Sequence, residues 1–346
     1  MLPFDRTHIK PGDRLCIAIS GGADSVALLL TLHAANTAKR DALGTGLSAI
    51  HVNHNLRAEE SDADQQFVTE LCNRLEIPLH IHQVSVTDRV SQTSETIEEA
   101  ARTLRYDIFR SLIADGRANS ILTAHTLDDQ AETVLMKLLR GAWTEGLGGI
   151  HPIVAVPNGK ILRPLLNTPR TVIEAFLKET SQPWREDSSN TDAAYTRNRL
   201  RHTILPLLRT ENPSLNQTLS NLAELAREEE TRWQSELGRI LPQILLPGKP
   251  VRGGGRAVST APGESASISI EIERLRPLDP AFRRRILRAA ARQLGARLNF
   301  DETARLLALC GFTQITTVSS KPGASLKLSN QLHAERSARE LRLSRP

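Results

Sequence analysis

Apolar and polar positions alternate in a regular order through the first half of the chain. Short apolar runs predict four strands, and the two-faced stretches between them predict helices. The predicted strands cover residues 15–19, 47–52, 79–84 and 120–124, and the predicted helices start near residue 24 and cover 62–75, 96–114 and 129–139. This alternation indicates an α/β fold with a doubly wound, mostly parallel sheet. Ligands of such sheets bind at the carboxyl ends of the strands, near the point where the strand order reverses.

The pattern becomes more helical in the rear half. A hairpin is predicted at 153–162, followed by helices at 171–179, 215–240 and 280–294. Between 247 and 266 the chain is rich in Gly, Pro and Ser, which favours a flexible segment. We therefore expect two domains, an α/β domain at 1–214 and a smaller, mainly helical domain at 215–346.

The net charge of +5 is unevenly distributed. From Leu219 onward, 21 Lys and Arg residues stand against 13 Asp and Glu residues. The helix at 280–294 has an apolar stripe opposed by a basic one, which consists of Arg284, Arg285, Arg288 and Arg292. A basic rear half suits a polyanion such as RNA, and a solvated Arg-rich surface explains the charge equally well.

Cysteine usage and hydropathy indicate the cellular compartment in which the protein works. The three cysteines, Cys16, Cys72 and Cys310, are odd in number and far apart, so neither a disulfide framework nor a zinc ribbon is expected. The N-terminus has no signal-peptide core, and no apolar run approaches the ~20 residues that span a bilayer. We expect a cytoplasmic protein without a membrane partner.

The strongest local motif is Ser20-Gly21-Gly22-Ala23-Asp24-Ser25, between the first strand and the first helix. Glycine lets the backbone approach a phosphate, and a helix N-terminus offers free N–H groups and a positive dipole end. Serine hydroxyls add donors, and Asp24 is a candidate Mg²⁺ ligand. The motif is neither a Walker loop nor a dinucleotide loop. A Gly-rich turn with a capping Asp24 or Ser25 is the ordinary alternative.

This hexapeptide resembles the PP-loop of the ATP-pyrophosphatase superfamily, which has an adenine nucleotide alpha-hydrolase-like fold. Such enzymes cleave ATP between its α and β phosphates and adenylate a carbonyl. Further segments, in this order and spacing, resemble the tRNA(Ile)-lysidine synthetase family: HVNHNLR at 51–57, ETIEEAARTLRY at 95–106, TAHTLDDQAET at 123–133, LRG at 139–141, GLGGI at 146–150, RPLL at 163–166, EDSSN at 186–190 and RNRLR at 197–201.

The resemblance implies a ligase that forms a carbon–nitrogen bond. ATP would adenylate the 2-keto oxygen of the wobble cytidine in the CAU anticodon of tRNA(Ile), with release of pyrophosphate. The ε-amine of lysine would then displace AMP and give lysidine, which changes the specificity of the tRNA from Met to Ile. One departure is Thr126, where the family usually has a second histidine. The chain is also expected to lack the second C-terminal domain of longer members.

The acidic group after the fourth strand is the predicted lysine site and consists of Asp128, Asp129 and Glu132. Asp128 and Glu132 are four residues apart on one helix face, where like charges repel and a bound cation removes the cost. Helix capping by one of them is the alternative. Arg105 is predicted to stabilise the α-phosphate, or else to join a surface network with Glu98, Glu99 and Arg102.

The remaining candidates follow from the same resemblance. The predicted catalytic residues are Asp24, Arg105, His125, Asp128 and Glu132. The predicted ATP-binding residues are 20–25 and His51, with ATP and Mg²⁺ as cofactors. The predicted tRNA-binding residues are Arg57, Arg197, Arg201, Arg284, Arg288 and Arg292. His51, His54 and His125 all fall at predicted strand ends, although a structural role is as common for histidine.

Two competing functions stay open at this point. Another PP-loop enzyme such as a tRNA thiolase would need paired cysteines, and a GMP or asparagine synthetase would need an amidotransferase domain. The alternative that is not an enzyme is an RNA-binding protein that retains an ancestral nucleotide-binding fold without catalysis. The sequence does not determine the oligomeric state, and a homodimer is one of the possibilities.

Overall fold

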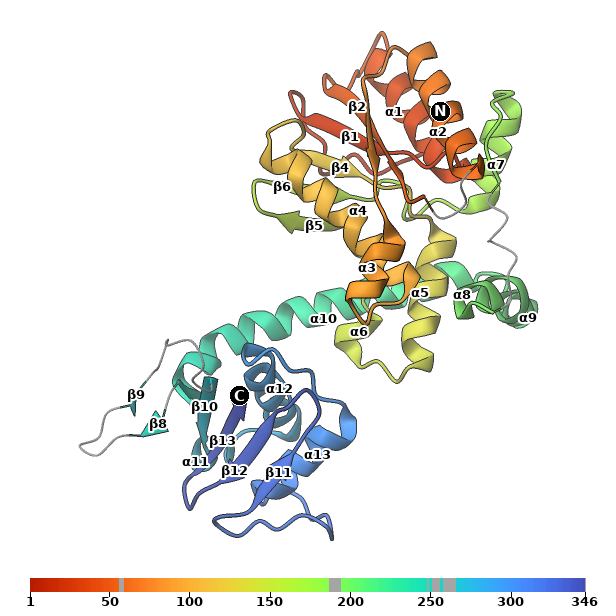
Figure 1. Ribbon diagram of the computed structural model, residues 1–346. Coiled ribbons are helices and arrows are strands. Elements are labelled where there is room, and N and C mark those ends of the chain that lie inside the picture. Colours follow the sequence, from red (N-terminus) through yellow and green to blue (C-terminus); the bar gives the residue numbers. More distant parts are fainter. Residues whose placement is uncertain (56–58, 187–193, 248, 251–255, 258–265, 346) are drawn as a thin grey trace. The chain divides into compact units, whose positions relative to one another are not determined.

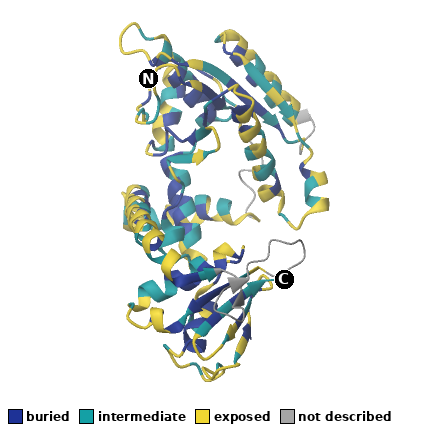
Figure 2. Ribbon diagram, turned by 90° about the vertical axis from the view of Figure 1, so that its left-hand side faces the viewer, coloured by how far each residue is buried: buried dark blue, intermediate teal, exposed yellow. Residues whose placement is uncertain are grey.

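The computed structural model describes residues 1–55, 59–186, 194–247, 249–250, 256–257 and 266–345, and it divides into two compact units (Figure 1). The units are Met1–Glu228 and Glu229–Pro346. Helix α10 (Leu215–Ile244) begins where the sequence predicted the second domain to start, but the division falls inside this helix. In Figure 2 the buried residues of each unit lie along its strands and on the inward faces of its helices.

The first unit is built on a six-stranded sheet with the order β3-β2-β1-β4-β6-β5. Its strands are β1 (Arg14–Ala18), β2 (Gly46–Asn53), β3 (Leu79–Gln83), β4 (Ser120–Leu122), β5 (Ile153–Val156) and β6 (Gly159–Leu162). All neighbours pair in parallel except the β5–β6 hairpin. The prediction of a doubly wound, mostly parallel sheet is confirmed. The strand order reverses between β1 and β4, so the ligand-binding switch point lies where these two strands end.

Helices cover both faces of this sheet. The helices are α1 (Ala23–Thr37), α2 (Glu59–Arg74), α3 (Val86–Gln92), α4 (Ile97–Ala114) and α7 (Arg170–Glu179). Val26 of α1, Val68 of α2 and Ile173 of α7 are fully buried in one core with Leu15 of β1. Phe109 of α4 is fully buried in a second core on the other face, because alternate strand residues point to opposite sides of a sheet.

Helices from two parts of the chain form a third core within the first unit. The first part follows β4 and consists of α5 (Leu127–Leu139), after which comes the short α6 (Thr144–Leu147). The second part follows α7 and comprises α8 (Thr196–Arg199), the π-helical turn η2 (Leu200–Ile204), α9 (Leu205–Glu211) and the start of α10. Ala131 and Val134 of α5 pack with Leu200 and Leu205, and Ala223 of α10 completes the contact. This packing holds the N-terminus of α5 against η2 and α9.

The second unit contains a five-stranded antiparallel sheet with the order β11-β12-β13-β10-β7. Its strands are β7 (Leu245–Pro247), β10 (Ala266–Glu271), β11 (Ser325–Lys327), β12 (His333–Arg336) and β13 (Glu340–Arg345), and its helices are α11 (Ile272–Leu275), α12 (Pro280–Gln293) and α13 (Phe300–Leu309). The prediction of a mainly helical domain missed this sheet. In β13, apolar residues such as Leu341 and Leu343 alternate with Arg and Ser, a pattern typical of a strand with one buried face, and the prediction, which relied on continuous apolar runs, overlooked it.

The predicted flexible segment at 247–266 lies largely outside the described residues. Its described part includes β8 (Lys249–Pro250) and β9 (Arg256–Ala257), which pair antiparallel. Among the described residues, no helix is both long and apolar enough to cross a bilayer.

Candidate active site

The phosphate loop, residues 20–25, joins β1 to α1 and folds back on itself. The Ser25 hydroxyl donates to the Gly22 carbonyl at 2.9 Å, and the Ser20 backbone N–H donates to Ser25 Oγ at 3.2 Å. Gly21 has a φ of +92°, a left-handed conformation that favours glycine. Gly22 is the N-cap of α1 and provides no side-chain cap, so amides of the first helical turn keep their capacity to bind an anion.

Asp24 lies in the first turn of α1, and neighbouring cations balance its negative charge only in part. Its Oδ2 lies 3.9 Å from Arg170 Nη1, whereas its Oδ1 is buried without a hydrogen-bond partner in the described structure. Burial raises the pKa of Asp24 to about 6; the Arg170 charge opposes this, and Asp129 adds to it. A carboxylate oxygen in this condition suits a hard cation such as Mg²⁺.

Two histidines lie at the carboxyl end of strand β2, His51 within the strand and His54 just after it. His51 is buried, and its Nδ1 donates to the Ile19 carbonyl at 2.9 Å, which ties β2 to the start of the phosphate loop. Burial lowers the pKa of His51, so the ring is neutral. Burial also lowers the pKa of His54 to about 4, with the Arg105 charge adding to the effect. His54 therefore lies near Arg105, and its Nδ1 is buried without a partner among the described residues.

Arg105 of α4 forms no ion pair with Glu98 or Glu99, although the nearby Glu98 charge acts to raise its pKa. Glu99 forms a capping box with Thr96, and the Arg102 guanidinium lies 5.0 Å from the centroid of the Tyr106 ring. Arg105 has no hydrogen bond or ion pair with any described residue. The side chain is exposed, yet surrounding protein atoms and the charge of Arg102 lower its pKa, while Tyr106 opposes the shift. An unpaired guanidinium in this position favours an anionic ligand.

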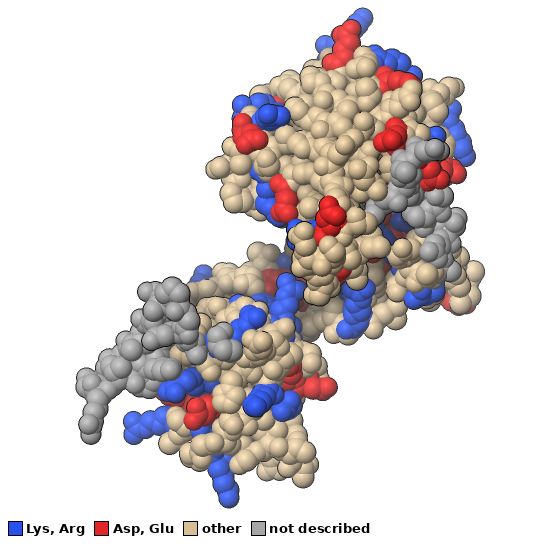
Figure 3. Space-filling view, in the orientation of Figure 1, with Lys and Arg blue, Asp and Glu red and all other residues tan. Residues whose placement is uncertain are grey.

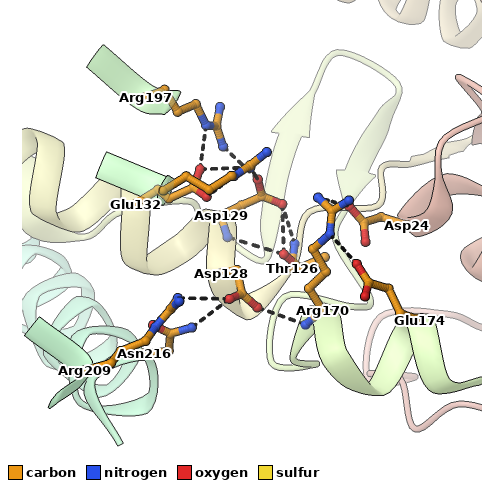
Figure 4. Close-up of polar contacts among 11 residues, drawn as sticks. Asp24, Thr126, Asp128, Asp129, Glu132, Arg170, Glu174, Arg197, Arg209 and Asn216 are labelled. Carbon is orange, nitrogen blue, oxygen red and sulfur yellow. Dashed lines mark hydrogen bonds and ion pairs between the residues drawn. The ribbon is translucent and has the colours of Figure 1, made fainter. Parts of the chain in front are cut away.

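The acidic set, Asp128, Asp129 and Glu132, lies in the first turns of α5 (Figure 4). Thr126 is the N-cap of this helix, and it forms a capping box with Asp129. Its backbone N–H and its hydroxyl donate to Asp129 Oδ2 at 2.9 and 3.0 Å. The residue at the position of the family's second histidine therefore has a structural role, because it fixes the direction of the Asp129 carboxylate.

Asp128 connects three segments of the first unit. Its Oδ2 accepts the Arg170 backbone N–H at 2.9 Å, at the start of α7. Its Oδ1 accepts hydrogen bonds from Arg209 Nη2 at 3.1 Å and from Asn216 Nδ2 at 2.9 Å. The alternative of helix capping therefore holds for Asp129, which completes the capping box with Thr126, but not for Asp128, whose carboxylate joins α7, α9 and α10.

Glu132 and Asp129 share two arginines of the segment 196–204 (Figure 4). Glu132 is 1% exposed and accepts Arg197 Nε at 2.8 Å and Arg201 Nε at 2.5 Å. Asp129 Oδ1 accepts Arg197 Nη2 at 2.8 Å. In this conformation, Arg197 and Arg201 therefore supply the positive charge that was expected to relieve repulsion within the acidic set.

His125 lies between β4 and the acidic set. Its Nδ1 is 3.0 Å from the Thr123 hydroxyl. Burial lowers the pKa of His125 to about 3, an effect opposed by Asp129 and reinforced by Arg163 and Arg197. The ring is therefore neutral at physiological pH, and it suits hydrogen bonding to a substrate better than proton transfer.

Sequence reasoning gave no role to Arg163, Arg170 or Arg209. Arg163 is 5% exposed and donates to the Tyr106 hydroxyl at 3.0 Å, which places a buried positive charge near His125. A signal for Arg170 was present, because a cation in the first turn of a helix opposes the helix dipole and needs an anionic partner. Two carboxylates serve as partners: Glu174, whose Oε1 lies 3.0 Å from Arg170 Nε, and Asp24, whose Oδ2 lies 3.9 Å from Arg170 Nη1.

The predicted tRNA-binding residues are found in different surroundings. Arg57 lies outside the described residues. Arg284 lies 5.2 Å from the centroid of the Phe300 ring, which is 71% exposed, and Arg288 donates to the Leu298 carbonyl. The exposed Arg292 is on the same helix. Figure 3 shows further Lys and Arg side chains on the visible face of the second unit.

The prediction that Arg285 lies on the exposed basic stripe is wrong. Arg285 is 3% exposed, pairs with Glu230 and lies 4.7 Å from the centroid of the Trp233 ring. It therefore packs α12 against α10 within the second unit. The helical periodicity alone could not show that this arginine is buried while others of the same helix face solvent.

The cysteines are unsuited to catalysis. Cys16, Cys72 and Cys310 are all free and buried. Burial raises the pKa of Cys16 and Cys72 to about 11 and that of Cys310 to about 12, so each remains a thiol. Since the thiolate is the reactive form, these positions do not support thiolase chemistry.

Comparison with known proteins gives consistent results. Residues 4–208 match the family described as PP-loop domain. The chain is 35% identical over 322 residues to a tRNA(Ile)-lysidine synthase of Solibacter usitatus, which covers 92% of this chain and 66% of that protein. It is 38% identical over 293 residues to the tRNA(Ile)-lysidine synthase of Nitratidesulfovibrio vulgaris, covering 85% of this chain and 82% of that protein.

A solved structure supports the fold. The U34-tRNA thiolase NcsA from Methanococcus maripaludis superposes with a TM-score of 0.54 at 18% sequence identity, over 65% of this chain and 76% of that chain. The similarity confirms the PP-loop architecture of the first unit.

Proposed function

The chain belongs to the tRNA(Ile)-lysidine synthase family, whose ATP-dependent reaction forms lysidine in tRNA(Ile), and we propose that its phosphate loop and acidic set carry out this reaction in two steps. It is a ligase that forms a carbon–nitrogen bond. In the first step the 2-keto oxygen of the wobble cytidine attacks the α-phosphorus of ATP and pyrophosphate leaves. In the second step the ε-amine of lysine attacks the activated carbon, loses a proton and releases AMP.

The phosphate loop and Arg105 serve the first step. The loop supplies backbone N–H groups and serine hydroxyls at the carboxyl end of β1, and Arg105 supplies a cation without a partner in the described structure. Negative charge builds on the phosphates as pyrophosphate leaves, so a positioned guanidinium stabilises the transition state more than the ground state.

Asp24 is the residue that would hold Mg²⁺. Its buried Oδ1 without a described partner fits a hard cation, and the metal would supply charge neutralisation on the phosphates. Among the described residues, no three His, Cys, Asp or Glu side chains converge on one point as a metal site.

The acidic set serves the second step by binding the lysine ammonium group. Glu132 and Asp129 already accept hydrogen bonds from cationic side chains at 2.8 Å, so their geometry suits a cation with several donors. Asp129 stays ionised, because the Arg197 charge and other contacts outweigh the effect of burial and lower its pKa. His125 adds a neutral ring beside them.

The second unit would bind the tRNA. Arg284, Phe300 and Arg292 present a guanidinium, an exposed ring and a second cation on α12 and α13. Phosphates attract the cations, and unpaired bases stack on aromatic rings.

The observation that carries the proposal is the pairing, at the ends of β1 and β4, of a glycine phosphate loop with a cation-binding acidic set. The test is incubation of the protein with ATP, labelled lysine and tRNA(Ile) bearing CAU, followed by measurement of label on the RNA. Label should appear only with ATP present and with release of AMP. Tight tRNA binding without labelling or AMP release would instead support a non-catalytic RNA-binding protein.

A further inference from the structure

Every carboxylate of the acidic set is already paired with an arginine of the same unit. Asp128 pairs with Arg209, whereas Asp129 and Glu132 share Arg197 and Arg201. The three carboxylates of the acidic set thus face three guanidinium groups, and these six charges balance. A lysine ammonium group placed between Asp129 and Glu132 would be a fourth cation for which the acidic set has no unpaired carboxylate, and this is unfavourable in a partly buried site.

Arg197 is the guanidinium whose place the substrate amine can take. It bridges Glu132 Oε2 and Asp129 Oδ1, each at 2.8 Å, so it occupies the position between the two carboxylates. Arg201 alone would keep Glu132 paired, because it donates to both oxygens of that carboxylate, at 2.5 and 3.0 Å. Removing Arg197 therefore leaves one negative charge for an incoming ammonium group.

The segment that carries Arg197 is short and irregular. Helix α8 has four residues, and its N-cap Tyr195 makes no side-chain hydrogen bond to the helix. The π-helical turn η2 follows it directly. Such turns recur at functional sites, and their hydrogen bonds have an α-helical alternative close by. The Arg197 side chain is 30% exposed, compared with 1% for Glu132, so it can leave toward solvent.

We propose that Arg197 is an internal competitor of the substrate amine and a determinant of lysine affinity. In the lysine-free protein its guanidinium occupies the position between Asp129 and Glu132, and it must leave before the ε-ammonium group binds there. The inference rests on the proposed lysine site. Once released, Arg197 can pair with a phosphate of the bound tRNA, so tRNA and lysine bind cooperatively and each raises the affinity for the other.

Equilibrium dialysis of labelled lysine, with and without tRNA(Ile), tests the proposal without requiring turnover. Arg197→Ala should bind lysine about tenfold more tightly than the wild type in the absence of tRNA, because no cation has to be displaced. Addition of tRNA should raise the lysine affinity of the wild type about tenfold and leave that of Arg197→Ala nearly unchanged. Arg199→Ala is the matched control, since Arg199 bonds Ala194 and Thr196 rather than the acidic set.

Two further variants separate the possible failures. Glu132→Gln should lose lysine binding; if lysine binds it as well as the wild type, the proposed lysine site itself is wrong. If Glu132→Gln loses binding but Arg197→Ala binds lysine no more tightly than the wild type, the site stands and the competitor role is overturned. Arg197→Lys, which retains the charge, should show a smaller gain and replaces Arg197→Ala if that variant does not fold.

Discussion

Replacing Thr126 by valine removes one hydroxyl and should affect both stability and lysine binding. The side chain is 1% exposed, and its hydroxyl donates to Asp129 Oδ2 at 3.0 Å and accepts the Asp129 N–H at 3.3 Å. Loss of an N-cap costs about 1 kcal/mol, and loss of a hydrogen bond to a charged group costs about 1.5–3 kcal/mol. Because the two terms share one hydroxyl, we expect a combined loss of about 2–3 kcal/mol in the free energy of unfolding.

Urea unfolding of the wild type, Thr126→Val and Thr126→Ser measures this loss. Thr126→Ser keeps the hydroxyl and should stay within about 0.5 kcal/mol of the wild type. Thr126→Val should also raise the lysine KM, because Asp129 Oδ2 then keeps only the backbone N–H of residue 126, and the carboxylate is less firmly oriented toward Glu132. The ATP KM should not change. In a protein that already carries Asp129→Asn, the cost of Thr126→Val should shrink, since the hydroxyl acts through that carboxylate.

A cost of Thr126→Val below about 0.5 kcal/mol, the range of ordinary surface substitutions, would refute the capping role. An equal cost with and without Asp129→Asn would refute the link between the hydroxyl and the carboxylate.

Three further predictions concern the other parts of the site. Arg105→Ala should lower kcat by a factor on the order of 10²–10³ with a small change in stability, as expected for loss of one transition-state contact, and a drop of only a few-fold in single-turnover assays would contradict its role. Burial raises the pKa of Asp24 to about 6, so the carboxylate loses its charge as the pH falls through 6. The kcat/KM for ATP of the wild type, divided by that of Asp24→Asn, should therefore fall about tenfold from pH 7 to pH 5. Dividing by the variant cancels the titration of ATP itself. A ratio that does not change with pH would argue against a role for the charged form of Asp24. Arg284→Ala should reduce the slope of log tRNA affinity against log salt by about one, and an unchanged slope would remove this residue from the interface.

The phosphate loop and the acidic set were predictable because their chemistry is local. Six consecutive residues specify the loop, and the position of Gly22 between an apolar strand and a helix fixes its place in the fold. Asp129 and Glu132 share a few turns of one helix with Thr126, so spacing alone brings them together.

The partners of these residues were not predictable in the same way. Arg197 reaches Glu132 across 65 positions of sequence, and Arg209 reaches Asp128 across 81. No periodicity encodes such contacts, since they depend on how α8, η2 and α9 pack against α5. The sequence therefore predicted Arg197 and Arg201 as tRNA ligands, and the structure finds both on carboxylates.

The sheet of the second unit shows a similar limit. Strand β12 has four residues, of which only Ala334 is buried, and β11 has three, of which only Leu326 is buried. Short strands with one buried apolar residue each resemble loops in sequence. They become part of a sheet by pairing β11 with β12 and β12 with β13, and the long-range pairing of β10 with β13 joins these three strands to the rest of the sheet.

A crystal structure of the protein with lysine and a non-hydrolysable ATP analogue is the most direct test of the whole account. We predict that the phosphates lie against Gly21 and Gly22 beside Asp24, and that the lysine ammonium group lies between Asp129 and Glu132. Triphosphate bound away from the loop, or lysine bound away from these two carboxylates, would contradict it.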